Sequence, residues 1–286
     1  MAEAVGDDAW LAAMLRFEAA LASAQARADL IPAEAANVIR AACEPARFDV
    51  GAIGRDAVTS ATPVVPLVDA LKRAVGERGA EFVHRGATSQ DAVDTAMMIV
   101  ARDGLDLLIG ELSELASRCA ALAKRYRDTP MAGRTLLVQA RPITFGLKAA
   151  TWLSGVIDAR ARLAEIRRSR LAVQLGGAVG TRDGFGSSGA QVVADVAKEL
   201  GLAVPEPLPW HSDRGRVAEL GAALAIAAGA AAKIALDVIL LSQTEVGEVT
   251  EASPGRSSAM PDKRNPAHAV EARAAFAGVV AQAGVL

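Results

Sequence analysis

The segment ARDGLDLLIGELSELASRCAALAKRYR, residues 101–127, decides the fold. Its apolar residues recur at spacings of three and four, which places them along one face of a helix; they are Leu105, Leu108, Ile109, Leu112, Leu115, Cys119, Leu122 and Tyr126. Residues 146–174 and 217–246 show comparable patterns, and the latter segment is apolar nearly all round, which suits the centre of a bundle. Each helix would be roughly 40–45 Å long. The pattern predicts an all-α protein built on an elongated bundle that subunits could share.

Composition supports this fold class and excludes several kinds of protein. Apolar residues make up 52 % of the 286 residues and aromatic residues only 3 %. The chain is rich in alanine, the best helix former, whereas sheets favour aromatic and β-branched residues. Shorter helices are predicted at 8–29, 33–43, 64–75, 90–100 and 190–201. A formal net charge of −2 excludes a globally basic nucleic-acid binder.

Membrane, disulfide and metal signals are weak. The most apolar stretch, 220–232, is shorter than the roughly 20 residues of a spanning helix, so a buried bundle helix is expected. The acidic start MAEAVGDDAW does not read as a signal peptide. Cys43 and Cys119 alone form no disulfide framework and fit a cytoplasmic protein. The three histidines are far apart in the sequence, so no metal site is expected.

Two polar loops carry candidate chemistry. In HRGATSQD (84–91), Thr88 or Ser89 could cap the following helix, or the same helix start could bind an anion. In GRSSAMPDKRNP (255–266), serines stand close to cations, an arrangement that could bind an anion and activate a hydroxyl. The alternative for this second loop is a solvated loop stiffened by its prolines. The residues alone leave both alternatives open.

Taken together, these segments resemble the fumarase/aspartase superfamily. SSAMPDKRNP at 257–266 is similar to its signature loop, and HRGATSQDAVDTA at 84–96 and GRTLLVQARPITFGLKAA at 133–150 are similar to two regions of its adenylosuccinate-lyase branch. Within that branch, TSQDAVDTA, TFGLKAATWL and PWHSDRGRVAEL most resemble the 3-carboxy-cis,cis-muconate cycloisomerase family, which forms lactones. The resemblance covers almost the whole chain.

The resemblance implies a small N-terminal helical domain (1–100) and a central helical-bundle domain (101–286) that carries the signature loop, here 251–266. It also implies a homotetramer with sites shared between subunits. If the long helices run up and down, 84–91 lies roughly 40 Å from 132–146 and 251–266, so neighbouring subunits must bring opposite ends together. Only 20 residues follow Pro266, so the C-terminal domain of the family is expected to be missing from this sequence.

The resemblance also assigns roles to residues. Ser258 would transfer the proton next to a substrate carboxylate, with Ser257 the weaker choice. Lys263 and Asn265 would hold that carboxylate, and Thr88, Ser89 and Gln90 would bind carboxylates from another subunit. His84 is a further substrate-binding candidate, and Gln139 and Arg214 are weaker ones. Near Arg214 the chain departs from the family, with Asp213 and Gly215 where Gln and Asp are usual. The intermediate would be a doubly charged aci-carboxylate, which needs converging cations and N–H donors but no cofactor.

The position after Gly133-Arg134-Thr135 bears on the reaction type. Fumarate-releasing relatives generally have His there, whereas this chain has Leu136, which cannot transfer a proton. Lactonisation needs no acid for a leaving group, because an ionised carboxylate of the same molecule attacks. We therefore expect a cycloisomerase of aromatic degradation acting on a small polycarboxylate, without a nucleic-acid or membrane partner. The alternatives are a lyase that releases fumarate from adenylosuccinate or a similar substrate, and an inactive structural protein that lost activity with its C-terminus.

Overall fold

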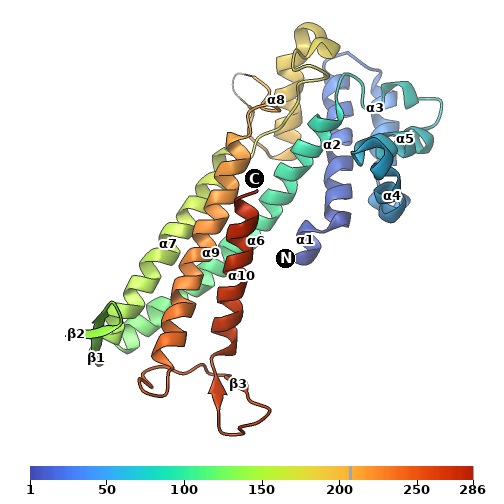
Figure 1. Ribbon diagram of the computed structural model, residues 1–286. Coiled ribbons are helices and arrows are strands. Elements are labelled where there is room, and N and C mark those ends of the chain that lie inside the picture. The colour runs from blue at the N-terminus through green and yellow to red at the C-terminus, as the bar shows by residue number, and fades with distance from the viewer. Residues whose placement is uncertain (206–207, 286) are drawn as a thin grey trace. The chain divides into compact units, whose positions relative to one another are not determined.

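The computed structural model describes residues 1–205 and 208–285. Glu206 and Pro207, in the predicted loop 205–216, lie outside the described residues, as does Leu286. Helices dominate (Figure 1), which confirms the all-α prediction. The α-helices are α1 (Ala2–Val5), α2 (Asp7–Arg27), α3 (Ala33–Ala42), α4 (Val50–Ser60), α5 (Val64–Val75), α6 (Ser89–Arg125), α7 (Phe145–Ser169), α8 (Gly189–Leu200), α9 (Gly215–Leu241) and α10 (Ala267–Ala283).

Short elements connect these helices. The 3₁₀ turns are η1 (Pro45–Arg47), η2 (Ala80–Phe82) and η3 (Asp183–Ser188), and the strands are β1 (Pro130–Thr135), β2 (Val138–Thr144), β3 (Gly255–Arg256) and β4 (Arg264–Asn265). The strands form two antiparallel pairs, β1 with β2 and β3 with β4.

Packing divides the chain into two compact units. Unit 1 comprises Met1–Leu107 and Arg167–Arg214, and unit 2 comprises Leu108–Ile166 and Gly215–Leu286. Residues 167–214 therefore pack with the N-terminal part of the chain. The predicted domains, 1–100 and 101–286, are continuous in sequence, whereas each unit combines two separate segments of the chain. The domain boundaries stay a prediction.

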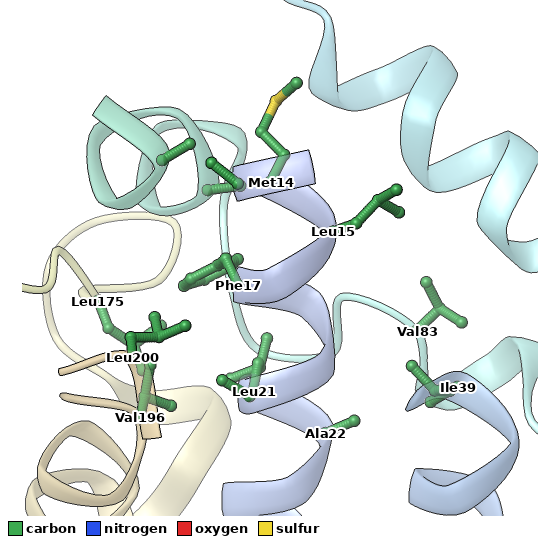
Figure 2. Packing of buried hydrophobic residues seen from close by; sticks show 14 of the residues in the cluster. Met14, Leu15, Phe17, Leu21, Ala22, Ile39, Val83, Leu175, Val196 and Leu200 are labelled. Atoms are coloured by element: carbon green, nitrogen blue, oxygen red, sulfur yellow. The ribbon is translucent and has the colours of Figure 1, made fainter. Parts of the chain in front are cut away.

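Helix α2 is the centre of unit 1 because its side chains are buried on almost every side. Figure 2 shows Phe17 and Leu21 directed toward Leu175 and the α8 residues Val196 and Leu200, while Leu15 and Ala22 lie on the side of α3 and Val83. Phe17 and Leu15 are fully buried. At about 25 cal/mol per Å² of apolar surface, such burial supplies most of the driving force for folding this unit.

Unit 2 is a bundle in which α7, α9 and α10 run side by side (Figure 1). Cys119 of α6, Trp152 of α7 and Ile234 of α9 pack together. Phe145 stands edge-on between two aromatic rings, at centroid distances of 5.3 Å from Tyr126 and 5.6 Å from Trp152. Edge-to-face contacts of this kind stabilise beyond the area that they bury.

Helix ends differ from the sequence expectations for local reasons. The predicted helices 90–100 and 101–127 are one helix, α6, because no residue between them breaks it. α7 ends at Ser169 and not near 174, since Gln174 bonds Thr95 through its main chain and Ala172 pairs with Ala203. α9 ends at Leu241 and not near 246, where Gly247 adopts a φ of 59°.

Among the described helices, α9 is long and apolar enough to span a membrane by length and composition alone. The apolar helix at the core of a soluble protein passes the same test. Only 22 % of its most apolar window is buried within this single chain, so α9 presents an apolar surface.

Candidate active site

The TSQD turn, residues 84–91, is built around unusual backbone positions. His84 has a φ of 59°, which a side chain rarely adopts, and Gly86 has a φ of 74°. A Cβ at Gly86 would lie 2.8 Å from the ring of Phe185, so only glycine fits there. Gln25 of α2 donates a hydrogen bond to the carbonyl of Arg85 over 2.7 Å. Contacts from distant elements therefore hold the turn in place.

His84 is fixed by a buried acid. Its Nδ1 lies 2.6 Å from Oε1 of Glu18, which is 2 % exposed on α2. Burial by itself lowers the pKa of His84, but the charge and hydrogen bond of Glu18 outweigh it, so the pKa is raised. The imidazole therefore holds its proton more tightly than a free histidine, next to the predicted anion site.

Asp91 organises the start of α6. Its fully buried carboxylate accepts four hydrogen bonds, from the main-chain N–H groups of Thr88 (3.0 Å), Gly176 (2.8 Å) and Gly177 (2.9 Å) and from the Gln174 amide (3.1 Å). Burial raises the pKa of Asp91, while these donors act in the opposite direction. Sequence reasoning missed Asp91, although Thr88-x-x-Asp91 before an apolar run is a capping-box signal.

Gln90 and Arg214 meet at a second buried acid. Arg214 binds both oxygens of Asp94, at 2.7 and 3.0 Å, and the Gln90 amide donates to Asp94 over 3.2 Å and to the carbonyl of His211 over 2.9 Å. The Arg214 guanidinium also lies 5.2 Å from the centroid of Trp210. The two predicted substrate-binding residues thus lie together, but both already bind protein atoms. Thr88 and Ser89 lie partly exposed beside them.

The signature loop has a different character. Strands β3 and β4 pair Gly255 with Asn265 and Arg256 with Arg264, so residues 257–263 form the hairpin loop between them. The Ser257 hydroxyl accepts hydrogen bonds from the N–H groups of Ala259 (3.4 Å) and Met260 (3.2 Å). Ser258 and Lys263 are exposed. The loop therefore presents the Ser258 hydroxyl and the Lys263 ammonium group to solvent on one short hairpin with Asn265.

Two glutamates anchor the segment before this loop. Glu251 accepts hydrogen bonds at the start of α10, from the N–H groups of His268 (3.4 Å) and Ala269 (2.9 Å) and from the His268 ring (3.0 Å). Burial raises the pKa of Glu251, but these bonds prevail and lower it. The Glu248 carboxylate accepts hydrogen bonds from both terminal nitrogens of Arg134, at 2.7 and 3.0 Å. No local sequence signal indicates either contact, because each partner is distant along the chain.

The β1–β2 hairpin carries Gln139 and Leu136, the residue on which the predicted reaction type depends. Gln139 is exposed on β2, opposite Arg134. Leu136 and Leu137 form the two-residue tip, with φ values of 51° and 65°. Asn-Gly is the usual sequence for such a tip, so leucine here is strained. Leu136 is 97 % exposed, so the hairpin ends in an apolar tip.

The predicted site residues fall into two groups. His84, Thr88, Ser89, Gln90 and Arg214 belong to unit 1, whereas Gln139, Ser258, Lys263 and Asn265 belong to unit 2. Within the described residues, no group of three or more His, Cys, Asp or Glu side chains is arranged to hold a metal ion. In unit 1 the donors and the Arg214 cation are bound by the carboxylates of Asp91 and Asp94, whereas unit 2 presents a hydroxyl and a cation on one exposed loop.

Comparison with known proteins connects these features to a family. The lyase family matches residues 2–281. The chain is 46 % identical over 278 residues to a 3-carboxy-cis,cis-muconate cycloisomerase of Bradyrhizobium diazoefficiens, covering 95 % of this chain and 61 % of that protein. It is 48 % identical over 297 residues to a nitrosuccinate lyase of Streptomyces davaonensis, covering 99 % and 62 %.

A solved structure agrees with these relatives. The crystal structure of the 3-carboxy-cis,cis-muconate lactonizing enzyme from Pseudomonas putida matches with a TM-score of 0.91 and 40 % identity, covering 99 % of this chain and 63 % of that one. The chain therefore spans less than two thirds of the length of these relatives.

Proposed function

This chain belongs to the lyase family, and from that premise we propose that it is a cofactor-free cycloisomerase of the fumarase/aspartase superfamily. It converts 3-carboxy-cis,cis-muconate to a carboxymuconolactone in the breakdown of aromatic compounds. Cycloisomerases of this name occur among relatives from several organisms, at 43 to 46 % identity. Because the chain spans 57 to 64 % of their length, the activity of the whole protein is part of the proposal.

The reaction needs one proton transfer at carbon. A carboxylate of the substrate attacks the double bond within the same molecule, and the electron pair moves onto the neighbouring carboxylate as an aci-carboxylate. Ser258 then delivers a proton to the carbon next to that carboxylate and takes one back from solvent. The lactone thus carries one proton more than the substrate and one negative charge fewer. Lys263 and Asn265 stabilise the doubly charged intermediate.

The hydrogen bonds of the signature loop support Ser258, and not Ser257, as the residue that transfers the proton. The oxygen of Ser257 is occupied by two main-chain N–H groups, so that serine shapes the turn. Ser258 is exposed and stands in the same loop as Lys263. A neighbouring cation favours an alkoxide, which is what the reverse reaction requires of its base.

Leu136 supports lactonisation over the release of an amine. Expelling the amine of adenylosuccinate requires an acid at the leaving nitrogen, and leucine at the exposed hairpin tip has no proton to give. A nitrosuccinate lyase activity is the second candidate, favoured by the 48 % identity to that enzyme. Elimination from a nitrosuccinate would expel nitrite, an anion that is stable without a proton, so Leu136 is compatible with it.

The proposal includes assembly into a homotetramer in the cytoplasm, with sites shared between subunits. The apolar surface of unit 2 supports assembly: Ile226 and Leu236 on α9 and Val270 and Val280 on α10 are 38 to 53 % exposed. Exposed apolar surface of this kind marks interaction sites. Both cysteines are free, in keeping with a reducing compartment. Light scattering at micromolar concentration tests assembly, and a well-behaved monomer would contradict shared sites.

The activity is tested by offering the purified chain four substrates. We expect 3-carboxy-cis,cis-muconate to lose its diene absorbance, and adenylosuccinate and argininosuccinate to release no fumarate. Nitrosuccinate is the fourth substrate, with nitrite as the measured product. Nitrite release with the muconate untouched would replace the cycloisomerase by the second candidate.

A further inference from the structure

A hollow in unit 2 is lined by none of the residues that are predicted to bind substrate or transfer a proton. It opens between the tip of the β1–β2 hairpin, the first turns of α7 and the end of α9, and Figure 1 shows the hairpin at the start of α7. Its walls combine apolar and charged side chains, among them Leu136, Leu137, Leu240, Arg134, Lys148 and Asp237. Val246, which also lines it, belongs to the segment that leads into the signature loop.

The charges of the hollow leave one cation in excess. Arg134 is compensated by the two bonds to Glu248. Asp237 accepts a 2.6 Å hydrogen bond from the indole N–H of Trp152 and a close contact from Lys233, one turn earlier on α9. The Lys148 ammonium lies farther from Asp237, at 3.8 Å. Lys148 also lies close enough to Glu248 to help lower the pKa of that carboxyl group. Three cations therefore face two carboxylates, and the ion pair of Lys148 is the longest of the three.

The position of Lys148 is fixed by the backbone around it. Gly146, two residues earlier, packs so closely on the end of α6 that a Cβ there would lie 2.6 Å from the Cα of Arg127. Its N–H donates to the carbonyl of Tyr126 over 2.9 Å. The Lys148 side chain is 25 % exposed, so a ligand can reach its ammonium group.

We propose that this hollow is a carboxylate subsite in which Lys148 holds the third carboxylate of a tricarboxylate substrate. The apolar walls suit the carbon skeleton of such a molecule, and the spare positive charge suits its extra anion. Asp237 positions the lysine and also competes with the ligand for it. The inference deepens the proposed cycloisomerase function and rests on it, because that substrate carries three carboxylates.

The test is calorimetric binding with two unreactive probes, propane-1,2,3-tricarboxylate and the dicarboxylate glutarate. Lys148→Met should weaken the tricarboxylate about 10- to 100-fold, since one charge-assisted hydrogen bond is lost, and should leave glutarate within about twofold. Lys124→Met, at an exposed position of α6, is the matched control and should change neither.

Asp237→Asn separates recognition from a structural ion pair. Asparagine keeps an oxygen for the Trp152 indole but frees Lys148, so the tricarboxylate should bind about threefold or more tightly. A purely structural Lys148–Asp237 pair predicts instead that both substitutions lower the melting temperature and leave the preference between probes unchanged. That outcome would overturn the subsite. Equal weakening of both probes by Lys148→Met would overturn it too, as would a failure of the unmodified chain to bind the tricarboxylate.

The binding measurement does not depend on turnover, so the two proposals can fail separately. Lys148-dependent tricarboxylate binding without conversion of 3-carboxy-cis,cis-muconate would retain the subsite and refute the reaction. Conversion of the muconate with a Lys148→Met variant of unchanged KM and kcat would retain the reaction and refute the subsite.

Discussion

The TSQD turn and the signature loop hold their polar groups in opposite ways. In the turn, Asp91 accepts four hydrogen bonds and Asp94 binds both Gln90 and Arg214. In the loop, Ser258 and Lys263 face solvent on a hairpin closed by two residue pairs. The turn is therefore held in place by its own buried carboxylates, whereas the hydroxyl and ammonium groups of the loop are accessible to a ligand.

This difference predicts where a substitution damages chemistry and where it damages the fold. Groups that face solvent can be removed without leaving a buried partner unpaired. Removing a buried acceptor, in contrast, leaves its buried donors without any hydrogen-bond partner. Variants of the loop should therefore lose turnover, and variants of the turn should lose stability.

The largest effect is expected at Ser258. Ser258→Ala should lower kcat at least about a thousandfold, because acid–base catalysis contributes 10²–10⁴, and should leave the melting temperature unchanged. Ser257→Ala is the matched control and should cost less in kcat. Greater damage from the Ser257 change would move the proton transfer to Ser257.

Asp91 should give the largest loss of stability. Asp91→Asn turns one accepting oxygen into a donor, so two of the four N–H groups lose their partner, at a cost of about 2–5 kcal/mol in the free energy of unfolding. Urea denaturation measures this difference. Asp56→Asn, on the exposed side of α4, should change it by less than about 0.5 kcal/mol. Equal, small effects of both changes would show that the network around Asp91 is dispensable.

The His84–Glu18 pair should add a pH-dependent term to the stability of unit 1. The raised pKa of His84 in the folded protein means that its contribution is fully present below the unfolded value of about 6.5. It is lost as pH rises through the folded value. The difference in the free energy of unfolding between the unmodified chain and His84→Gln should therefore shrink as the pH rises through the folded pKa of His84. Glu18→Gln should abolish the trend, and a difference that grows with rising pH would contradict the assignment.

The smallest effect is expected in the unmodified chain, as a change in the ordering of the signature loop when ligand binds. Amide hydrogen exchange in residues 257–263 should be fast without ligand and slow when a tricarboxylate is bound, because the loop must admit substrate. Exchange at Gly176 and Gly177, whose N–H groups bind Asp91, should be slow in both states. Equal protection of the loop with and without ligand would argue against its closure.

Local pattern predicted most of the helices. The segment 64–75 coincides with α5, and 8–29 lies within a residue or two of α2, because their apolar periodicity is strong. Helix α4 was not predicted, as Gly51 and Gly54 weaken its helical signal; it is capped by Asp49, which accepts from Ala52 over 3.0 Å. Helix α10 and the β1–β2 hairpin were also missed, the latter because Leu136-Leu137 is not a turn sequence.

The candidate site was predictable only where a motif is local. The signature loop and the TSQD turn were found from consecutive residues, and the chain's membership of the lyase family agrees with that resemblance. The partners Glu18, Glu248 and Glu251 were not predicted, since each acts on a residue between 17 and 114 positions away. Such pairings depend on tertiary packing, which periodicity does not encode.

The central claim is that the leucine-tipped hairpin belongs to a lactone-forming enzyme and not to a fumarate-releasing one. The most direct test follows the ultraviolet absorbance of 3-carboxy-cis,cis-muconate and, in parallel, fumarate release from adenylosuccinate, with the unmodified chain and Ser258→Ala. The account predicts that the diene absorbance disappears only with the unmodified chain and that adenylosuccinate stays intact. Fumarate release with the muconate untouched would contradict it and require an acid at another position, such as His84 of a neighbouring subunit.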